Sequence, residues 1–299
     1  MSWLFLAALS AVFLGFYDIF KKVSLERNAV LPVLFFCSLT GLILFSPVAA
    51  LSVFRPEMAQ RYDVFVAPMG FSGHLLILAK AGIVTLSWVL TFFAIKHLPI
   101  SLASPIRASA PLFTVLGAIT LFSEIPSHAQ LGGIAVTLGS YFLFSILGRK
   151  EGIIFERNRW VWMLFAGTLV GAVSGLYDKH LLQSAKLAPM SVQFYFTAYN
   201  TLLQGLIVGI FWWPVRATTT PFRFRGSIWL VGRLLLVADN VYFRALSVPG
   251  ALVSVVSTVR RSNVVISFAV GSLLFREQRR WQKAVALVGV LVGLVLLLR

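Results

Sequence analysis

Long runs of apolar residues, separated by short polar segments, follow one another along almost the whole chain. Each run is long enough to be a membrane-spanning helix, because about 20 residues rising 1.5 Å each cross the roughly 30 Å of hydrocarbon in a bilayer. We therefore predict ten transmembrane helices in two series of five. The first series covers residues 3–20, 30–54, 75–95, 101–122 and 130–147, and the second covers 160–182, 191–214, 227–246, 251–275 and 281–298.

The composition also indicates a membrane protein. Hydrophobic residues make up 59% of the 299 residues and charged residues only 12%, whereas soluble domains carry about 25% charged residues. With so little polar surface, lipid must cover the outside of the fold, and the short loops leave no room for a soluble catalytic domain. The predicted fold class is thus an all-α, polytopic membrane protein, and we expect it in the cell (inner) membrane.

The net charge of +16 comes from lysines and arginines scattered through the short loops. Nucleic-acid binding calls for a clustered basic surface, so this distribution favours the lipid bilayer as partner and argues against nucleic acid. The loops after the first, third, fifth, seventh and ninth spans hold most of the basic residues. By the positive-inside rule those loops are cytoplasmic, which would put both termini outside.

The sequence contains no motif for a cofactor, a metal or enzymatic catalysis. Its single cysteine, Cys37, cannot form a disulfide within the chain, and its four histidines lack the spacing of metal ligands. A glycine-rich phosphate loop is also missing, which argues against direct use of ATP. We expect neither a cofactor nor enzymatic activity.

The two series are copies of one repeat. Residues 104–124 align with residues 257–277 with six identities, including Arg107 with Arg260, and the Tyr-Asp pair at 17–18 recurs at 177–178. A repeated arginine inside an apolar span is rare. We predict a first five-helix repeat at residues 1–148, a basic linker at 149–159 and a second repeat at 160–299, which work together as one transport unit.

Five spans per repeat is an odd number, so the second copy enters the membrane from the opposite side. A pseudo-two-fold axis in the membrane plane then relates the two inverted repeats. Such symmetry suits alternating access, because each half can adopt the conformation of the other. The architecture therefore predicts a secondary transporter.

With these features the chain resembles the drug/metabolite transporter superfamily, whose EamA-type carriers have ten helices in two repeats. A local similarity to the triose-phosphate and nucleotide-sugar translocators rests on Leu-Pro-Ile-Ser at 98–101, Ile-Arg-Ala at 106–108, Pro-Leu-Phe at 111–113 and Val-Arg-Arg at 259–261. In that branch lysines at the matching positions bind the substrate phosphate; here both are arginines, and Ala110 replaces the usual acidic residue. The resemblance also implies that Glu124 and Glu277 close the fourth and ninth spans and that both termini lie inside, against the count of basic loops.

Several charged and aromatic residues inside the spans are candidates for the transport site. Arginine binds carboxylate and phosphate in a bidentate manner, and neighbouring helical residues point about 100° apart, so one of Arg260 and Arg261 could face a cavity while the other pairs with an acid such as Asp239. Snorkelling to the membrane interface is the alternative. The predicted substrate-binding residues are Arg107, Arg260, Arg261, Lys80, Tyr242 and Arg233.

The second group of candidates comprises Tyr17, Asp18, Tyr177, Asp178 and Asp239, which we assign to gating or proton coupling. The alternative for the two Tyr-Asp motifs is interfacial charge pairing, since they fall near the ends of their predicted spans. The predicted function is export or exchange of a small anionic or zwitterionic metabolite, with a phosphorylated compound as first candidate. The alternatives are an amino-acid or amphipathic-drug exporter and a lipid-phosphate flippase. A small-molecule substrate is the expected partner, and a homodimer remains open.

Overall fold

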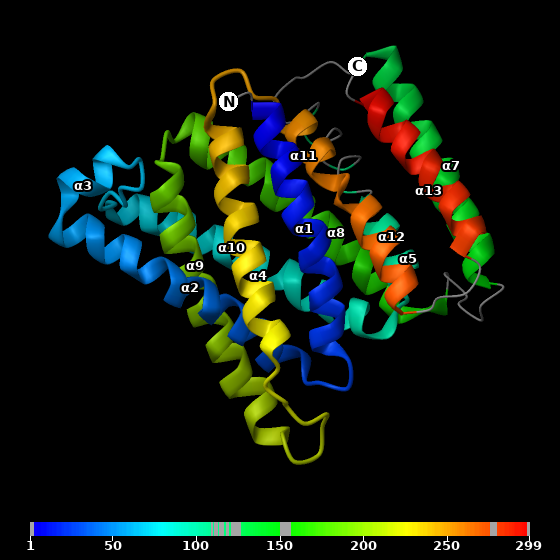
Figure 1. Ribbon diagram of the computed structural model, residues 1–299, viewed down its shortest axis with the longest axis horizontal. Helices are drawn as coiled ribbons and strands as arrows, with labels where there is room; N and C mark the ends of the chain where they lie inside the picture. Colours follow the sequence, from blue (N-terminus) through cyan, green and yellow to red (C-terminus); the bar gives the residue numbers. More distant parts are fainter. Residues whose placement is uncertain are drawn as a thin grey trace.

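The computed structural model describes residues 3–108, 110, 113, 117, 120, 127–149, 157–275 and 280–297. Within these ranges the chain forms helices joined by short loops, without a strand (Figure 1). Six of the described helices are long and apolar enough to cross a membrane. The predicted all-α, membrane-embedded fold class is therefore confirmed.

Helices lie in all ten predicted spans. The first half contains α1 (Trp3–Leu25), α2 (Val30–Phe54), α3 (Pro56–Arg61), α4 (Phe71–His97), α5 (Ile100–Ala108) and α7 (His128–Arg149). The second half contains α8 (Arg159–Lys179), α9 (Pro189–Ile207), α10 (Gly226–Ser247), α11 (Val253–Arg261), α12 (Asn263–Leu274) and α13 (Arg280–Leu297). Two π-helical turns, His180–Ser184 and Val208–Trp212, extend α8 and α9. Some positions named in the sequence analysis lie outside the described residues: Pro111, Leu112, Glu124, Glu277 and residues 150–156 of the linker.

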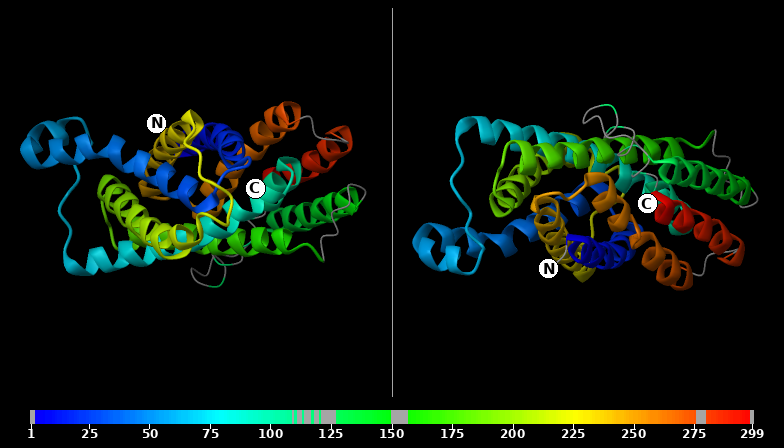
Figure 2. Two further views of the ribbon diagram at one scale, coloured as in Figure 1. Left: turned by 90° about the horizontal axis from the view of Figure 1, so that it is seen from below. Right: turned by 90° about the horizontal axis from the view of Figure 1, so that it is seen from above.

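The helices form two layers (Figure 2). One layer contains α1, α2, α10, α11 and α12, and the other contains α4, α5, α8 and α9, while α7 and α13 pack against each other at one end. Each layer therefore combines helices from both halves of the sequence. The strongest packing within the layers is between α1 and α10 in one and between α4 and α8 in the other.

The packing partners form a symmetric pattern. Exchanging each helix for its counterpart converts the α1–α10 contact into the α8–α4 contact, and the α2–α10 contact into the α9–α4 contact. The pairs α2–α9, α5–α12 and α7–α13 map onto themselves. In Figure 1, α1 begins and α13 ends at the same end of the bundle, as an even number of spans requires. An approximate two-fold relation between inverted halves accounts for this pattern.

Two departures from the predicted elements are local. The short helix α3 was not predicted; it begins at Pro56, which favours the first turn of a helix because it lacks the N–H that such a turn leaves unpaired. The ninth span is two helices, because Ser262 turns the chain between α11 and α12. At this turn the Ser262 hydroxyl donates to the Val259 carbonyl, and the Asn263 amide donates to Asp18 on α1. Side chains of this kind compete with regular helical hydrogen bonding.

Two hydrogen-bonded contacts, which we call the Lys22 clasp and the Gln183 clasp, join the layers at opposite ends. In the last turn of α1, Lys22 Nζ donates to the carbonyl oxygens of Ile95 (2.6 Å) and Leu98 (2.7 Å). After α8, Gln183 Nε2 donates to those of Leu246 and Ala251, both at 3.0 Å. The donors stand four residues after Asp18 and five after Asp178. A π-helical turn absorbs the additional residue, so the two clasps are equivalent under the repeat.

The contact between α2 and α10 leaves no space for a side chain at Gly232. A Cβ atom there would lie 2.5 Å from the Cys37 carbonyl oxygen and 2.6 Å from Thr40 Cβ. We predict that Gly232→Ala lowers the free energy of unfolding by about 1–3 kcal/mol, the usual cost of overpacking, measured by thermal unfolding in detergent. The matched control is Gly82→Ala on α4, where nothing lies within 4 Å. Equal stability of the two variants would contradict this close approach.

Candidate functional site

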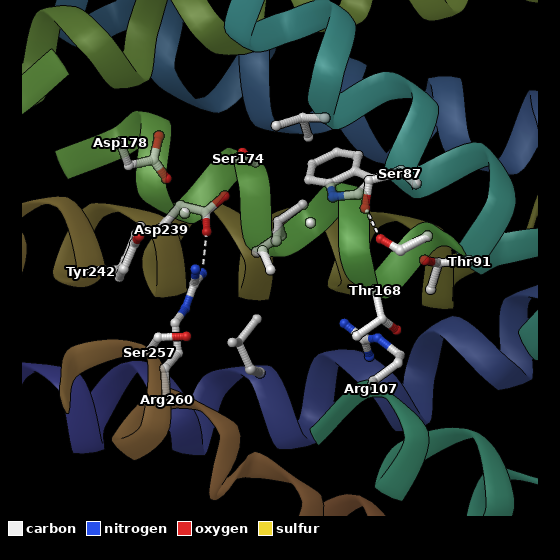
Figure 3. A pocket seen from close by; sticks show the side chains of 18 of the residues that line it. Ser87, Thr91, Arg107, Thr168, Ser174, Asp178, Asp239, Tyr242, Ser257 and Arg260 are labelled. Carbon is white, nitrogen blue, oxygen red and sulfur yellow. Dashed lines mark hydrogen bonds and ion pairs between the residues drawn. The ribbon is translucent and has the colours of Figure 1, made fainter. Parts of the chain in front are cut away.

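A central cavity lies between the two layers and is lined by residues of α1, α4, α5, α8, α9, α10 and α11. It encloses about 1040 Å³ of empty space, counting the solvent at its opening. Figure 3 shows Arg107 and Arg260 entering it from separate helices. Both repeats therefore contribute to one site, as the paired arginines predict.

Arg260 on α11 has three different contacts. Its Nη2 forms an ion pair with Asp239 Oδ1 on α10, and its Nε donates to Ser10 Oγ on α1 at 3.1 Å. Its guanidinium carbon lies 4.1 Å from the centre of the Tyr242 ring, within range of a cation–π contact. The predicted pairing of one arginine with Asp239 is thus present, and it is Arg260 that both pairs and lines the cavity.

Arg107 on α5 approaches a different carboxylate. Its Nη1 pairs with Asp18 Oδ1 on α1. The same oxygen accepts from Lys21 Nζ at 2.7 Å, and Asp18 Oδ2 accepts from Asn263 Nδ2 at 2.8 Å. Both carboxylate oxygens are therefore occupied, and the Asp18 side chain is only 3% exposed.

Lys80 on α4 and Asp178 on α8 form a buried ion pair. Lys80 Nζ also lies 4.6 Å from the centre of the Phe196 ring and 5.1 Å from that of Phe243. The aromatic rings replace part of the hydration that the ammonium group loses on burial. This pair joins α4 to α8 beside the cavity. The Tyr242 hydroxyl approaches α8 at Gly175, where a Cβ atom added to the glycine would lie 3.9 Å from the hydroxyl oxygen.

Arg261 lines the cavity, and no group in the described part of the chain is hydrogen-bonded to its buried Nε. A buried donor of this kind costs free energy unless a ligand or water accepts from it. Arg261 is therefore the lining cation whose hydrogen bonding is least satisfied by the described part of the protein.

Aromatic and hydroxyl-bearing residues line the cavity beside several aliphatic residues and glycines. Trp88, Phe92 and Phe196 supply apolar walls, and Ser87, Thr91, Thr168 and Ser257 supply hydroxyl groups. Among the described residues, counted with their partners, the charged side chains are five cations (Lys21, Lys80, Arg107, Arg260 and Arg261) and three carboxylates (Asp18, Asp178 and Asp239). The difference leaves two positive charges, so the cavity attracts anions.

The predicted site residues divide into those at the cavity and those elsewhere. At the cavity, or paired with its lining, are Arg107, Arg260, Arg261, Lys80, Tyr242, Tyr17, Asp18, Asp178 and Asp239. Arg233 is exposed and does not line it. Tyr177 points towards α4 instead, where its hydroxyl donates to the Leu76 carbonyl at 3.2 Å.

Asp18 and Asp178, for which interfacial charge pairing is the alternative, each form ion pairs inside the protein. Both are buried, at 2% and 4% exposure, because α1 and α8 continue beyond them to Leu25 and Ser184. Lys21, which is not among the predicted site residues, lines the cavity and pairs with Asp18. Lys21 follows Asp18 by three residues, and side chains at that spacing are neighbours on a helix, so the sequence contained a sign of this ion pair.

Comparison with known proteins agrees with this architecture. Residues 1–146 match the model of the EamA-like transporter family, a family of carriers and not of enzymes. No curated protein shows a significant sequence match to the chain. A solved protein whose title reads "Crystal structure of protein" has a similar fold, with a TM-score of 0.65 and 16% identity over 97% of each chain. That similarity concerns the fold alone, and it extends over both halves. The match of residues 1–146 to the EamA-like transporter family, together with the apolar helices, indicates an integral membrane transporter of the drug/metabolite type.

Proposed function

We propose that this transporter is a secondary carrier of small organic anions, with phosphorylated metabolites as the first candidates. The observation that carries the proposal is the excess of two positive charges around one central cavity, to which both halves contribute an arginine. A phosphate monoester carries about −1.5 to −2 charges at pH 7. Arginine suits phosphate and carboxylate better than lysine does, because its donors form a planar fork.

The proposed mechanism is alternating access between two repeats, residues 1–148 and 160–299. The Lys22 clasp and the Gln183 clasp support it, since they join the same two layers at opposite ends of the bundle. Opening one clasp while the other stays closed would expose the cavity to one side of the membrane at a time. Inverted repeats are suited to such an exchange. We place the carrier in the cell (inner) membrane.

The aromatic wall of the cavity favours one further class of substrate. Trp88, Phe92 and Phe196 could stack on an apolar or aromatic group of an amino acid or amphipathic drug, while an arginine bound its carboxylate. Trp229 does not line the cavity among the described residues. In this second candidate function the ligand is zwitterionic or amphipathic, and the aromatic residues contribute more to its binding than the cations do.

Counterflow in proteoliposomes tests the proposal. Vesicles containing the protein are preloaded with one unlabelled compound and given its labelled form outside: inorganic phosphate, 3-phosphoglycerate, glucose 6-phosphate, phenylalanine or glucose. We expect labelled phosphate compounds to enter several-fold faster than in protein-free vesicles, and glucose not to enter. Uptake of phenylalanine alone would favour the amino-acid alternative and contradict the anion proposal.

A further inference from the structure

Asp239 stands apart from the other two carboxylates of the site. Asp18 has three side-chain partners, and Asp178 is paired with a lysine that is only 2% exposed. Asp239 has Arg260 as its one ion-pair partner, and no described side chain or backbone group donates to its Oδ2. Its side chain is 14% exposed, against 3% for Asp18 and 6% for Asp178. Of the three, it is the carboxylate most accessible to water.

Asp239 also lies where two cavities meet. Besides the central cavity it lines a second, smaller one between α2, α9 and α10, which we call the polar crevice. Polar side chains in its wall are Ser38, Gln193, Thr197 and Asn200. Asn200 and Ser38 are hydrogen-bonded to each other at 3.3 Å, and Thr85 donates to Asn200 at 2.7 Å. Buried groups of this type are compatible with bound water.

A series of side-chain contacts leads from the polar crevice to the protein surface. Gln193 accepts from Asn240 Nδ2 at 2.8 Å, and Asn240 accepts from Arg244 Nε at 3.1 Å. Arg244 in turn pairs with Asp63, whose side chain is 86% exposed. These contacts connect the polar crevice, which Asp239 lines, to the exposed surface through side chains outside the central cavity. The two faces of this carboxylate therefore have separate surroundings.

From this arrangement we infer that Asp239 is the proton-binding site of the carrier, and that a proton is bound and carried together with each anion. The inference rests on the proposed anion transport. An anion bound to Arg260 brings a second negative charge next to Asp239, and two anionic groups that share one site favour protonation of one of them. Protonation of Asp239 neutralises it and leaves Arg260 to the substrate. Proton and anion thus increase each other's affinity.

The charged and titratable groups around Asp239 are consistent with this coupling. Arg260 of α11 is the cation that faces it, and Asp178 of α8 adds a negative charge. The uncharged titratable groups nearby are Tyr17 of α1, Cys37 of α2 and Tyr242 of α10. In the crevice α9 presents the amides Gln193 and Asn200, which do not titrate. Loading one dianion and one proton adds a net charge of −1 to a cavity with two excess positive charges, so it remains positive.

Proton uptake on binding is the first test, because it uses the wild-type protein. Purified protein in weakly buffered detergent at pH 8, where glucose 6-phosphate is a dianion, receives that compound in the presence of a pH-indicator dye. We expect about one proton to be taken up for each anion bound. Asp239→Asn should bind the anion with no proton uptake, whereas Glu57→Gln, which alters an exposed carboxylate on α3 away from these contacts, should behave like wild type. Binding of the anion by wild type without proton uptake would overturn the inference.

Transport gives the second test. With the membrane voltage clamped to zero, a pH difference of one unit should raise the accumulation of labelled 3-phosphoglycerate about tenfold in wild-type vesicles. Asp239→Asn should retain counterflow and lose this accumulation. If wild type exchanges the anion and the pH difference has no effect, the coupling is wrong while the anion carrier stands. If none of the anions exchanges, the proposed function itself fails.

Discussion

Arg260→Gln will reduce exchange of an anionic substrate about 100-fold or more. The change removes the cation that faces both Asp239 and the cavity, and hydrogen bonds to charged groups contribute about 1.5–3 kcal/mol each, so the loss of two is of this size. Initial rates of counterflow in proteoliposomes measure the effect. Arg260→Lys keeps the charge without the planar fork and should retain a small part of the activity.

The matched control is Arg233→Gln. Arg233 lies on α10, but it is exposed and outside the cavity, so its loss should leave exchange within about twofold of wild type. The two variants change the net charge equally, which separates a binding role from a general electrostatic effect. If both variants exchange the anion equally well, Arg260 serves the fold and not the substrate. A melting curve for each variant excludes loss of folding as the cause.

Asp178→Asn will have the largest effect on stability. The change leaves Lys80 buried without its counter-ion, and removing one partner of a buried ion pair costs about 3–5 kcal/mol. The apparent melting temperature in detergent should fall by roughly 10 °C. The contacts of Lys80 with the rings of Phe196 and Phe243 offset only part of this loss.

Two further variants identify the cause of that loss. Lys80→Met together with Asp178→Asn removes both charges, and stability should return to near that of wild type, because no buried charge is left unpaired. Asp63→Asn breaks the ion pair with Arg244 at the surface, where Asp63 is 86% exposed, and should change stability by less than about 1 kcal/mol. An Asp178→Asn protein as stable as Asp63→Asn would contradict a stabilising role for the buried pair.

The spans and their division into halves could be predicted because each depends on residues close together in the sequence. Apolar runs mark α2 and α4 without reference to the rest of the fold, and the repeated arginine relates Arg107 to Arg260. The prediction that one arginine faces a cavity while its neighbour pairs with Asp239 follows from helical geometry alone. The structure combines the two roles in Arg260.

The partners of the buried charges could not be predicted, because they depend on how far one helix slides along another. A shift of a single turn would move Lys80 about 5 Å from Asp178, which lies 98 residues further along the chain. The turn at Ser262 was missed for a similar reason: it accompanies a hydrogen bond from Asn263 to Asp18, 245 residues away. Arg233 is flanked in the sequence by apolar residues, as a cavity residue would be, but it lies on the exposed side of α10.

The two clasps use different donors and the same type of acceptor, and this makes the carrier chemically unequal at its two ends. The acceptors are the main-chain carbonyls of Ile95, Leu98, Leu246 and Ala251, so neither clasp uses a side-chain acceptor. The donors are an ammonium group at Lys22 and a neutral amide at Gln183, and hydrogen bonds from a charged donor are roughly twice as strong. The two ends of the fold are therefore held by hydrogen bonds of unequal strength, with the stronger donor at the Lys22 end.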